Sequence, residues 1–361
     1  MSSFDDFFEK RPYEYSVEEK TTLLNDRIGE LTGKHYDNCE QYRNIMDMFG
    51  YNRNISYSYS DVPFIPVRLF KELELKSVES DSVFKTLTSS GTTGQSVSRI
   101  FLDRETASNQ QKVLVKIVSD FTGATRMPMI IIDCPSVIKD RRLFSARGAG
   151  ILGFSIFGKD KVFALDDDMK LNIDVLREFI EAHAGKKILL FGFTFMIWQY
   201  FLNELKKEDI KLDLSDSILI HGGGWKKLES EKITRDQFRQ ALYDSCSISD
   251  IHDYYGMVEQ TGCIYMECEY GHLHTSVFSD VIIRRPDDFS IADVGETGII
   301  EVVSSIPESY PGHVLLTEDI GRIVYDDGCK CGRKGKCFEI HGRIRHAELR
   351  GCSDTYAAEH G

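Results

Sequence analysis

Short apolar segments alternate with amphipathic segments over residues 103–251, and this alternation constrains the fold more than any other feature of the chain. The apolar segments have the length of buried strands and lie at 129–132, 187–191, 217–220 and 248–251. The amphipathic segments have helical spacing and lie at 103–123, 172–183, 193–208 and 230–243. Strands that alternate with helices form a parallel sheet with helices on both faces. The sequence therefore predicts an α/β region.

Past Gly256 the spacing changes and leaves no room for helices between the apolar segments. Strands are predicted at 277–284, 298–303, 314–317 and 320–325, joined by turns rich in Gly, Pro and Asp. Strands joined this closely form an antiparallel sheet or half-barrel. Residues 1–80 contain helical stretches, such as 16–32, and are expected to form a helical layer on the main domain.

Composition excludes several classes of protein. The chain has 44 basic and 57 acidic residues, and its net charge of −13 disfavours nonspecific binding to nucleic acid or anionic membranes. No apolar run approaches the length of a membrane span and the chain starts acidic, so we expect a cytoplasmic enzyme. Most of the nine cysteines fall between Cys263 and Cys337, which favours metal or thiol chemistry over a disulfide framework.

Residues 86–96, which read Thr-Leu-Thr-Ser-Ser-Gly-Thr-Thr-Gly-Gln-Ser, crowd hydroxyls and bare backbone N–H groups into one turn. Gly91 and Gly94 can take positive φ and let the backbone approach an anion closely, while the hydroxyls add donors. The turn lacks the lysine and the spacing of a Walker loop. A solvated loop is the alternative interpretation. As a phosphate site, the turn would use Thr88, Ser89, Ser90, Gly91, Thr92, Thr93 and Gly94.

Four further motifs lie downstream. The first, His221-Gly222-Gly223-Gly224, directly follows a buried strand, where ligands bind in an open α/β sheet. Its three glycines would let a flat ring lie against the backbone, although a flexible turn would have the same composition. The other three are Tyr-Tyr-Gly-Met-Val-Glu at 254–259, Leu-Thr-Glu-Asp-Ile-Gly-Arg at 316–322 and His-Gly-Arg at 341–343.

The loop at 86–96 and the last three motifs resemble, in the same order, the adenylate-forming superfamily, whose members make acyl-AMP from a carboxylic acid and ATP. The resemblance implies that Tyr255 and Gly256 belong to the adenine slot. It implies that Glu259 holds Mg²⁺ on the phosphates. Val258 stands where the family usually has threonine, which removes one expected hydroxyl contact to phosphate.

The two later motifs carry further implied nucleotide contacts. By the resemblance, Asp319 accepts hydrogen bonds from the ribose hydroxyls, with Glu318 in place of the family's glycine. Arg343 stands at the family's hinge motif, where the arginine reaches the ribose or a phosphate. The aspartate that usually follows this arginine is missing.

Two cysteine- and histidine-containing segments form a separate candidate site. Thiolates and imidazoles at short spacing on two loops can supply four tetrahedral ligands to Zn²⁺. The segments resemble two loops of the phenylacetate-CoA ligase branch, which points to Cys268, His274, Cys329 and Cys331 as ligands of a structural zinc. His272, Cys263 and Cys337 are possible substitutes, and scattered thiols without a metal are the alternative.

The end of the chain bears on the subclass. Adenylate-forming ligases continue past the hinge into a small mobile domain that brings a lysine to the adenylation step, and few residues follow Arg345 here. We therefore expect that domain and its lysine to be absent. Lys226, Lys227 or Arg343 would stand in for the lysine.

The tail around Cys352 and the glycine motif resemble the acyl-protein synthetases of bacterial luminescence fatty acid reductase complexes. In that family a cysteine near the C terminus takes the acyl group from acyl-AMP and passes it to a partner protein. The resemblance makes Cys352 the acyl-accepting residue, ATP and Mg²⁺ the cofactors, a fatty acid the expected substrate and an acyl reductase the expected partner.

This interpretation gives four segments. They are a helical layer at 1–80, an α/β nucleotide- and acyl-binding region at 81–256, an antiparallel region with zinc loops at 257–340, and a hinge-like segment with the tail at 341–361. Two alternative functions stay open. One is a ligase that delivers the acyl group to coenzyme A or another small acceptor, and the other is a non-catalytic nucleotide-binding subunit.

Overall fold

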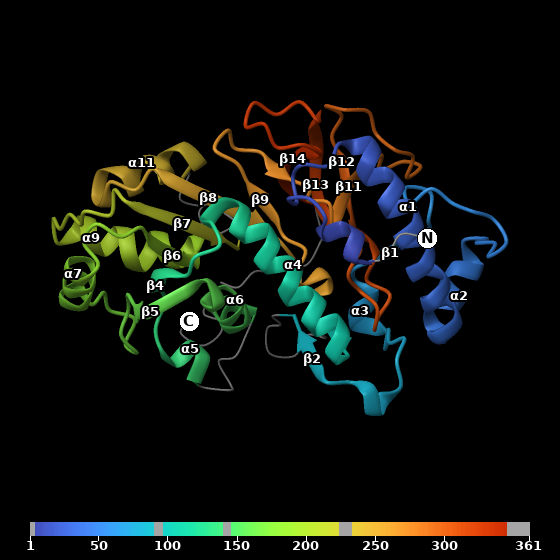
Figure 1. The fold of residues 1–361 in the computed structure, drawn as a ribbon, viewed down its shortest axis with the longest axis horizontal. Helices are drawn as coiled ribbons and strands as arrows, with labels where there is room; N and C mark the ends of the chain where they lie inside the picture. Colours follow the sequence, from blue (N-terminus) through green and yellow to red (C-terminus); the bar gives the residue numbers. More distant parts are fainter. Residues whose placement is uncertain (1–3, 90–96, 140–145, 224–232, 345–361) are drawn as a thin grey trace. The chain divides into compact units, whose positions relative to one another are not determined.

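A computed structural model describes residues 4–89, 97–139, 146–223 and 233–344. Contacts divide the chain into two compact units, and each is described by itself below (Figure 1). The described residues of the first unit are 4–89, 97–121 and 256–344, and those of the second are 122–139, 146–223 and 233–255. The first unit is therefore assembled from segments that are not consecutive in the sequence.

The second unit is built on a parallel sheet with the strand order β8-β7-β6-β4-β5. Its strands are β4 (Met127–Ile132), β5 (Gly158–Phe163), β6 (Ile188–Phe193), β7 (Ser217–Gly222) and β8 (Asp250–Tyr255). Every residue of β4, β6 and β7 is buried, as expected for strands with helices on both faces. The predicted parallel α/β region is confirmed.

One strand of this sheet, β5, was not predicted. It pairs only with β4 in the strand order and so lies at an edge of the sheet. Its sequence, Gly-Lys-Asp-Lys-Val-Phe, carries charged residues that are largely exposed. Charged side chains are common on edge strands, where they block pairing with other chains, and they hide the apolar signal of a buried strand.

Helices of the second unit begin and end where the sequence supplies caps. The helix α7 (Ile173–Ala182) starts at Asn172, whose side chain accepts a hydrogen bond from the backbone N–H of Val175. The helix α11 (Arg235–Cys246) starts with a capping box between Thr234 and Gln237. The other helical elements are α5 (Ser136–Lys139), α6 (Ala146–Phe154), η3 (Ser155–Phe157), α8 (Thr194–Met196), the π-helical η4 (Ile197–Leu202) and α9 (Asn203–Lys207).

The first unit contains an antiparallel sheet with the strand order β11-β12-β13-β14-β10-β9. Its strands are β9 (Tyr265–Glu267), β10 (Leu273–His274), β11 (Ser279–Arg284), β12 (Gly298–Ser304), β13 (Val314–Asp326) and β14 (Lys336–Arg343), and β1 (Ile65–Pro66) pairs with β13. The predicted antiparallel region is confirmed. The two strands predicted at 314–317 and 320–325 are one strand, β13, so Glu318 and Asp319 lie within a strand and not in a turn.

A separate hairpin and one long helix complete the core of the first unit. The hairpin joins β2 (Lys85–Thr88) to β3 (Arg99–Leu102). The helix α4 (Arg104–Thr122) follows, and Asp103 accepts a hydrogen bond from the backbone N–H of Thr106 at its start. In the part of the chain that the structure describes, no helix combines the length and apolarity needed to cross a membrane.

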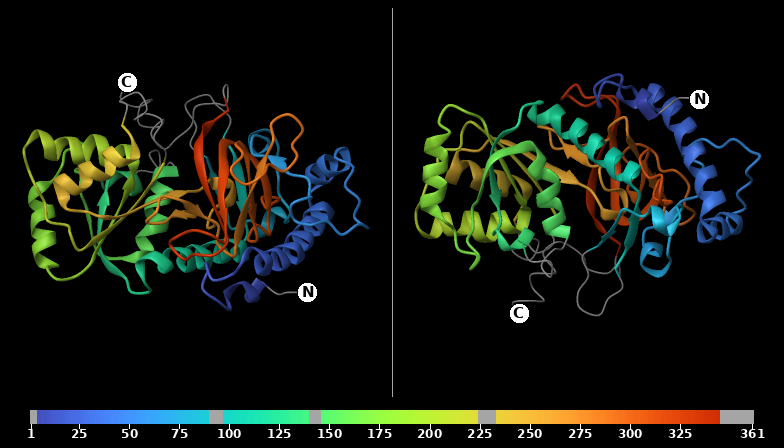
Figure 2. Two further views of the ribbon diagram at one scale, coloured as in Figure 1. Left: turned by 90° about the horizontal axis from the view of Figure 1, so that it is seen from above. Right: turned by 60° about the horizontal axis from the view of Figure 1, so that its bottom comes forward.

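The N-terminal segment is helical, with η1 (Phe4–Phe8), α1 (Val17–Asn38), α2 (Glu40–Met48), α3 (Leu69–Glu72) and η2 (Ser80–Ser82). Figure 2 shows α1 and α2, in blue, alongside the orange and red strands of the antiparallel sheet. Polar side chains of α1 reach buried partners on that sheet. Lys20 pairs with Asp280, and Arg27 donates to the backbone oxygen of Ser305.

Two buried histidine rings lie close together, tilted by 33°, where α1 meets the segment after β12. The rings of His35 and His313 are 4.9 Å apart. His35 Nε2 donates to the Pro307 carbonyl (2.9 Å), and its Nδ1 lies 2.8 Å from the Ser77 hydroxyl, from which it accepts when the ring is neutral. Burial lowers the pKa of His35 from 6.5 to about 3, and burial also lowers the pKa of His313.

We predict that this histidine pair makes the fold sensitive to mild acid. The folded-state pKa values are lowered, so the stabilisation is present above the unfolded-state pKa and is lost as pH falls below it. Between about pH 7.5 and about pH 5.5, protonation of each histidine in the unfolded state should lower the free energy of unfolding by about 1 kcal/mol. Denaturant unfolding at the two pH values measures this loss.

The variant His35→Gln removes one of the two titrating groups. It should be less stable than wild type at neutral pH but should lose less stability on acidification. If the free energy of unfolding of His35→Gln fell with pH as much as that of the wild type, His35 would not be a source of the acid sensitivity.

Candidate functional site

The predicted phosphate loop is the connection of the β2–β3 hairpin. Thr88 pairs with Arg99 in the ladder. Beyond it, the backbone N–H of Ser89 donates to the Ser98 carbonyl (3.2 Å), and the N–H of Ser98 donates to the Ser89 hydroxyl (2.9 Å). The hairpin thus brings the two ends of the loop together. The remaining predicted residues, Ser90, Gly91, Thr92, Thr93 and Gly94, lie outside the described residues.

Glu259, the predicted magnesium ligand, is buried in the short helix η5 (Val258–Gln260). Its backbone oxygen accepts from the Tyr310 hydroxyl (2.9 Å). The next side chain, Gln260, donates to the carbonyl of Gly312 (2.9 Å). These contacts fix the backbone that carries the carboxylate.

Electrostatics connect Glu259 with two of the other predicted motifs. Burial raises the pKa of Glu259, and the Ser98 hydroxyl and the charge of Arg343 oppose that shift, while Glu318 adds to it. Ser98 belongs to the base of the predicted phosphate loop, and Arg343 and Glu318 belong to the last two motifs. Within the first unit, the fold therefore brings together the base of the phosphate loop and three motifs that lie far apart in the sequence, namely those of Glu259, Glu318 and Arg343.

Asp319 and Arg343 face each other on neighbouring strands. They are register partners in the β13–β14 ladder, and Arg343 Nε donates to Asp319 Oδ1 (3.0 Å). The Thr317 hydroxyl accepts from the backbone N–H of Asp319 (3.1 Å). The pair is held by strand register rather than by a turn, so these two predicted nucleotide contacts form one charged unit.

The glycine motif ends β7 in the second unit. A Cβ on Gly222 would lie 2.6 Å from the Tyr254 ring, and a Cβ on Gly223, which has φ +92°, would lie 2.8 Å from the Phe193 ring. Both positions therefore require glycine. In the described residues, the rings that lie against Gly222 and Gly223 are the protein's own Tyr254 and Phe193 side chains. Gly224 lies outside the described residues.

Tyr255 follows Tyr254 at the end of β8 and is partly buried. Successive side chains of a strand point to opposite faces, so Tyr255 faces away from the side on which Tyr254 packs against Gly222. Gly256, the next predicted residue, is assigned to the first unit. Tyr254 and Tyr255 are adjacent in the sequence motif, but their side chains therefore point to opposite faces of the sheet.

Sequence reasoning missed a polar group at the same edge of the parallel sheet. The Thr194 hydroxyl lies 2.9 Å from His221 Nδ1 and donates to the Gly222 carbonyl (3.1 Å), so it accepts from Nδ1–H. Burial lowers the pKa of His221 to about 3. At the end of β4, Arg147 Nε lies 3.2 Å from the buried Asp133. The sequence signal that could have revealed these polar groups is the polar residue that directly follows each apolar strand.

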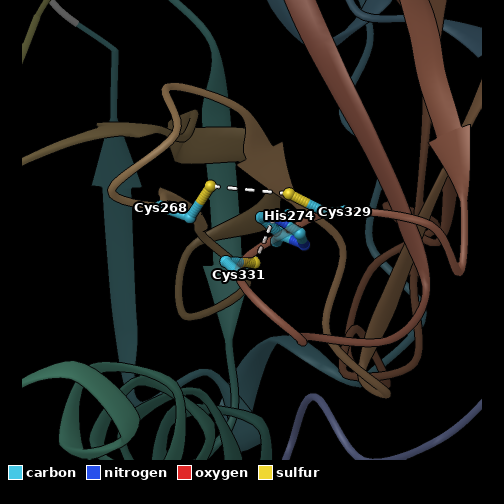
Figure 3. A group of neighbouring side chains, drawn as sticks. All are labelled: Cys268, His274, Cys329 and Cys331. Carbon is cyan, nitrogen blue, oxygen red and sulfur yellow. Dashed lines mark hydrogen bonds between the residues drawn. The ribbon is translucent and has the colours of Figure 1, made fainter.

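The four predicted metal ligands come together in the first unit (Figure 3). One ligand atom from each of Cys268, His274, Cys329 and Cys331 lies within 4.8 Å of all the others. Cys268 Sγ is 3.8 Å from Cys329 Sγ, and Cys331 Sγ is 3.4 Å from His274 Nε2. Tetrahedral zinc, with Zn–S of about 2.3 Å and Zn–N of about 2.0 Å, separates its ligand atoms by about 3.8 Å and about 3.5 Å respectively.

Tight turns present these ligands. Cys268 follows β9, and its carbonyl accepts from the N–H of Gly271, which has φ +85°. Cys329 and Cys331 lie in the β13–β14 connection, where the N–H of Gly332 donates to the Cys329 carbonyl. Burial raises the pKa of the Cys268 thiol to about 12, so a cation is needed to hold it as a thiolate.

The three residues predicted as possible substitute metal ligands differ in their surroundings. His272 and Cys337 form a second group with Cys329, again with ligand atoms within 4.8 Å. Cys263 belongs to neither group, because its thiol lies against the Ser304 hydroxyl (3.2 Å) and the Phe278 carbonyl (3.4 Å). The predicted catalytic cysteine, Cys352, lies outside the described residues, as do Lys226 and Lys227.

Sequence comparisons place this chain among acyl-transferring ligases. The family model described as "Acyl-protein synthetase, LuxE" matches residues 1–360. The chain is 25% identical over 371 residues to the long-chain-fatty-acid--luciferin-component ligase of Aliivibrio fischeri, covering 99% of this chain and 94% of that protein. It is 23% identical over 356 residues to the ligase of the same name from Vibrio harveyi, with coverages of 97% and 91%.

A solved structure shares the fold. An open conformation of 2-hydroxyisobutyryl-CoA ligase, in complex with 2-HIB-AMP and CoA, matches with a TM-score of 0.73 at 12% identity. The match covers 94% of this chain and 73% of that chain. A likeness at this identity shows the fold alone, and the fold is the one predicted from the sequence.

Proposed function

The chain belongs to the acyl-protein synthetase family, LuxE, and from this premise we propose how its residues activate an acid and transfer the acyl group. It is a ligase that activates a carboxylic acid as acyl-AMP and then transfers the acyl group. The match of the family model over residues 1–360 carries this conclusion. The names of the curated relatives support a long-chain fatty acid as the substrate.

In the first step a carboxylate oxygen attacks the α-phosphorus of ATP, and pyrophosphate leaves. The loop from Thr88 to Gly94 would hold the phosphates, and Glu259 would hold Mg²⁺, which neutralises charge on the reacting phosphates. The proximity of Ser98 to Glu259 supports this assignment, because it places the base of the loop beside the carboxylate.

The other predicted motifs would supply the remaining nucleotide contacts. Asp319 would accept from the ribose hydroxyls, and Arg343 would donate to the ribose or a phosphate. Their ion pair supports a shared role, since it fixes the direction of the guanidinium. Tyr255, Gly256 and the glycine motif at 222–224 would form the adenine slot.

The same ion pair bears on which cation replaces the mobile lysine of related ligases. Arg343 is held by Asp319 at 3.0 Å, which favours a positioning role over one that requires movement. Lys226 and Lys227 follow the glycine motif in the sequence, after Trp225. We therefore favour one of these lysines as the cation for the adenylation step.

In the second step the Cys352 thiolate attacks the acyl carbonyl, and AMP leaves as the thioester forms. The burial of the other cysteines supports Cys352. Of the eight cysteines that the structure describes, all are buried except Cys331, which is partly buried and belongs to the metal group. The thioester would then pass its acyl group to a thiol of a partner protein, for which an acyl reductase is the expected class.

Zinc is the metal that the donor set of the first group fits. Three thiolates and one imidazole are typical of closed structural zinc sites, and the ligand spacing matches tetrahedral coordination. The group joins the turn after β9 to the β13–β14 connection, both of which are short and irregular. We propose that Cys268, His274, Cys329 and Cys331 hold a structural zinc that fixes these two segments together.

The first prediction from this function concerns Glu259→Gln. The change keeps the shape of the side chain but removes the charge that holds Mg²⁺, so acid-dependent pyrophosphate exchange should fall by about 10². At low concentrations of Mg²⁺ and ATP, exchange by the wild type should also fall as pH decreases, with a midpoint above the ordinary glutamate pKa, because the free enzyme needs the carboxylate and its pKa is raised. A surface control, Glu296→Gln, should exchange normally.

The second prediction concerns Cys352→Ser. Incubation with ATP, Mg²⁺ and a long-chain fatty acid should leave a hydroxylamine-labile acyl group on wild-type Cys352, detected by peptide mass spectrometry. The serine variant should lose the label and keep pyrophosphate exchange. Cys134→Ser, at the carboxyl end of β4, is the matched control and should be labelled normally. Acyl-CoA formation by Cys352→Ser would instead favour a coenzyme A ligase.

The third prediction concerns the structural metal. Purified protein should retain at least one zinc per chain through dialysis, and its removal by a chelator should lower the unfolding temperature. His274→Gln should lose this zinc. Elemental analysis that finds no zinc in protein produced with zinc available would rule out the assigned ligand set.

A further inference from the structure

Cys329 belongs to two groups of metal-ligating atoms at once. The first is the proposed zinc group with Cys268, His274 and Cys331, and the second contains His272 and Cys337. In each group, all ligand atoms lie within 4.8 Å of one another. The two groups share Cys329 alone.

The second group has the spacing expected of metal ligands. Cys329 Sγ lies 3.5 Å from His272 Nδ1, close to the separation of about 3.5 Å between sulfur and nitrogen ligands of one tetrahedral zinc. Cys337 is fully buried in β14, where it pairs in register with His274 of β10. Strand pairing therefore fixes the Cys337 side of this group before any metal binds.

The environment of His272 is that of a metal-bound imidazole. Its Nδ1 faces Cys329, and its Nε2 lies 3.8 Å from the carboxylate of Glu339. Histidines that bind a metal through one ring nitrogen commonly direct the other toward a carboxylate, which orients the ring. Glu339 is itself held by Arg322 (3.0 Å), so the orienting group is fixed as well.

The first group already supplies a full set of four tetrahedral ligands. His272 and Cys337 are therefore surplus to a single closed zinc, yet they are placed at ligand distance from one of its thiolates. Charge is consistent with two metals, since four thiolates from Cys268, Cys329, Cys331 and Cys337 balance two divalent cations. A buried cluster with no net charge avoids the cost of an uncompensated buried ion.

We propose that Cys329 bridges two metal positions, the closed zinc position and a second one formed by Cys329, Cys337 and His272. The second position has three protein ligands and so leaves one coordination site for water or another small ligand. His272 is partly exposed, which gives this position access to solvent. Its occupant is a divalent metal with affinity for thiolate and imidazole, of which zinc is the first candidate. The proposal builds on the proposed structural zinc and is independent of the acyl-transfer chemistry.

The test is the metal stoichiometry of the full chain. Purified protein is titrated with Zn²⁺ and, in parallel, with Co²⁺, and bound metal is counted by native mass spectrometry. Wild type should bind two metals per chain. His272→Gln and Cys337→Ser should bind one, whereas the matched control Cys263→Ser, a buried cysteine outside both groups, should bind two. With two Co²⁺ bound, the bridging thiolate should couple them magnetically.

Two outcomes would overturn the proposal. One is saturation of the wild type at a single metal in excess Zn²⁺, and the other is two metals in both His272→Gln and Cys337→Ser. Because His272 is only partly buried, His272→Gln remains informative if Cys337→Ser does not fold. Absence of any metal from the wild type would instead defeat the structural zinc itself, which separates the two failures.

Discussion

The first unit depends on one buried carboxylate, Asp280 on β11. It accepts from Lys20 of α1 (3.0 Å), from Lys336 of β14 (2.8 Å) and from the Tyr59 hydroxyl. Burial alone would raise the pKa of Asp280, but the two lysines hold it well below its usual range. Removing the carboxylate would leave two ammonium groups without their partner, which costs about 3–5 kcal/mol for a buried pair. A single side chain thus ties the N-terminal helix to both β11 and β14.

The strand that Lys336 begins, β14, carries parts of two sites. At its start lie Lys336 and Cys337, next to the metal groups, and at its end lies Arg343, paired with Asp319 of β13. The β13–β14 ladder contains two irregularities, so its register is not set by simple pairing along its length. A metal held by Cys329 and Cys331 would fix the connection between these strands. By fixing that connection, it would also help fix the register that brings Arg343 opposite Asp319.

How much of this could be predicted from the sequence differs between elements. The buried strands β4, β6 and β7 were predicted because all their residues are buried, which leaves a short run of apolar residues in each. The strands β9 and β10 were missed because they have only two or three residues, too few for a periodic pattern. The resemblance to the phenylacetate-CoA ligase branch pointed to Cys268, His274, Cys329 and Cys331, and the structure brings these four side chains together. The sharing of Cys329 was not predicted, because it follows from the pairing of β10 with β14, which no local pattern encodes.

Charge around Glu259 indicates how the nucleotide would bind. Burial raises the pKa of Glu259 and Glu318 raises it further, while Arg343 divides its charge between Glu259 and Asp319. ATP without a metal would bring more negative charge to these carboxylates and would be repelled. Mg²⁺ that arrives with ATP would reverse the balance, because a divalent cation favours the ionised form of a nearby carboxyl group. On the proposed function, magnesium and nucleotide therefore bind together, and Glu259 gives up any proton it holds as they bind.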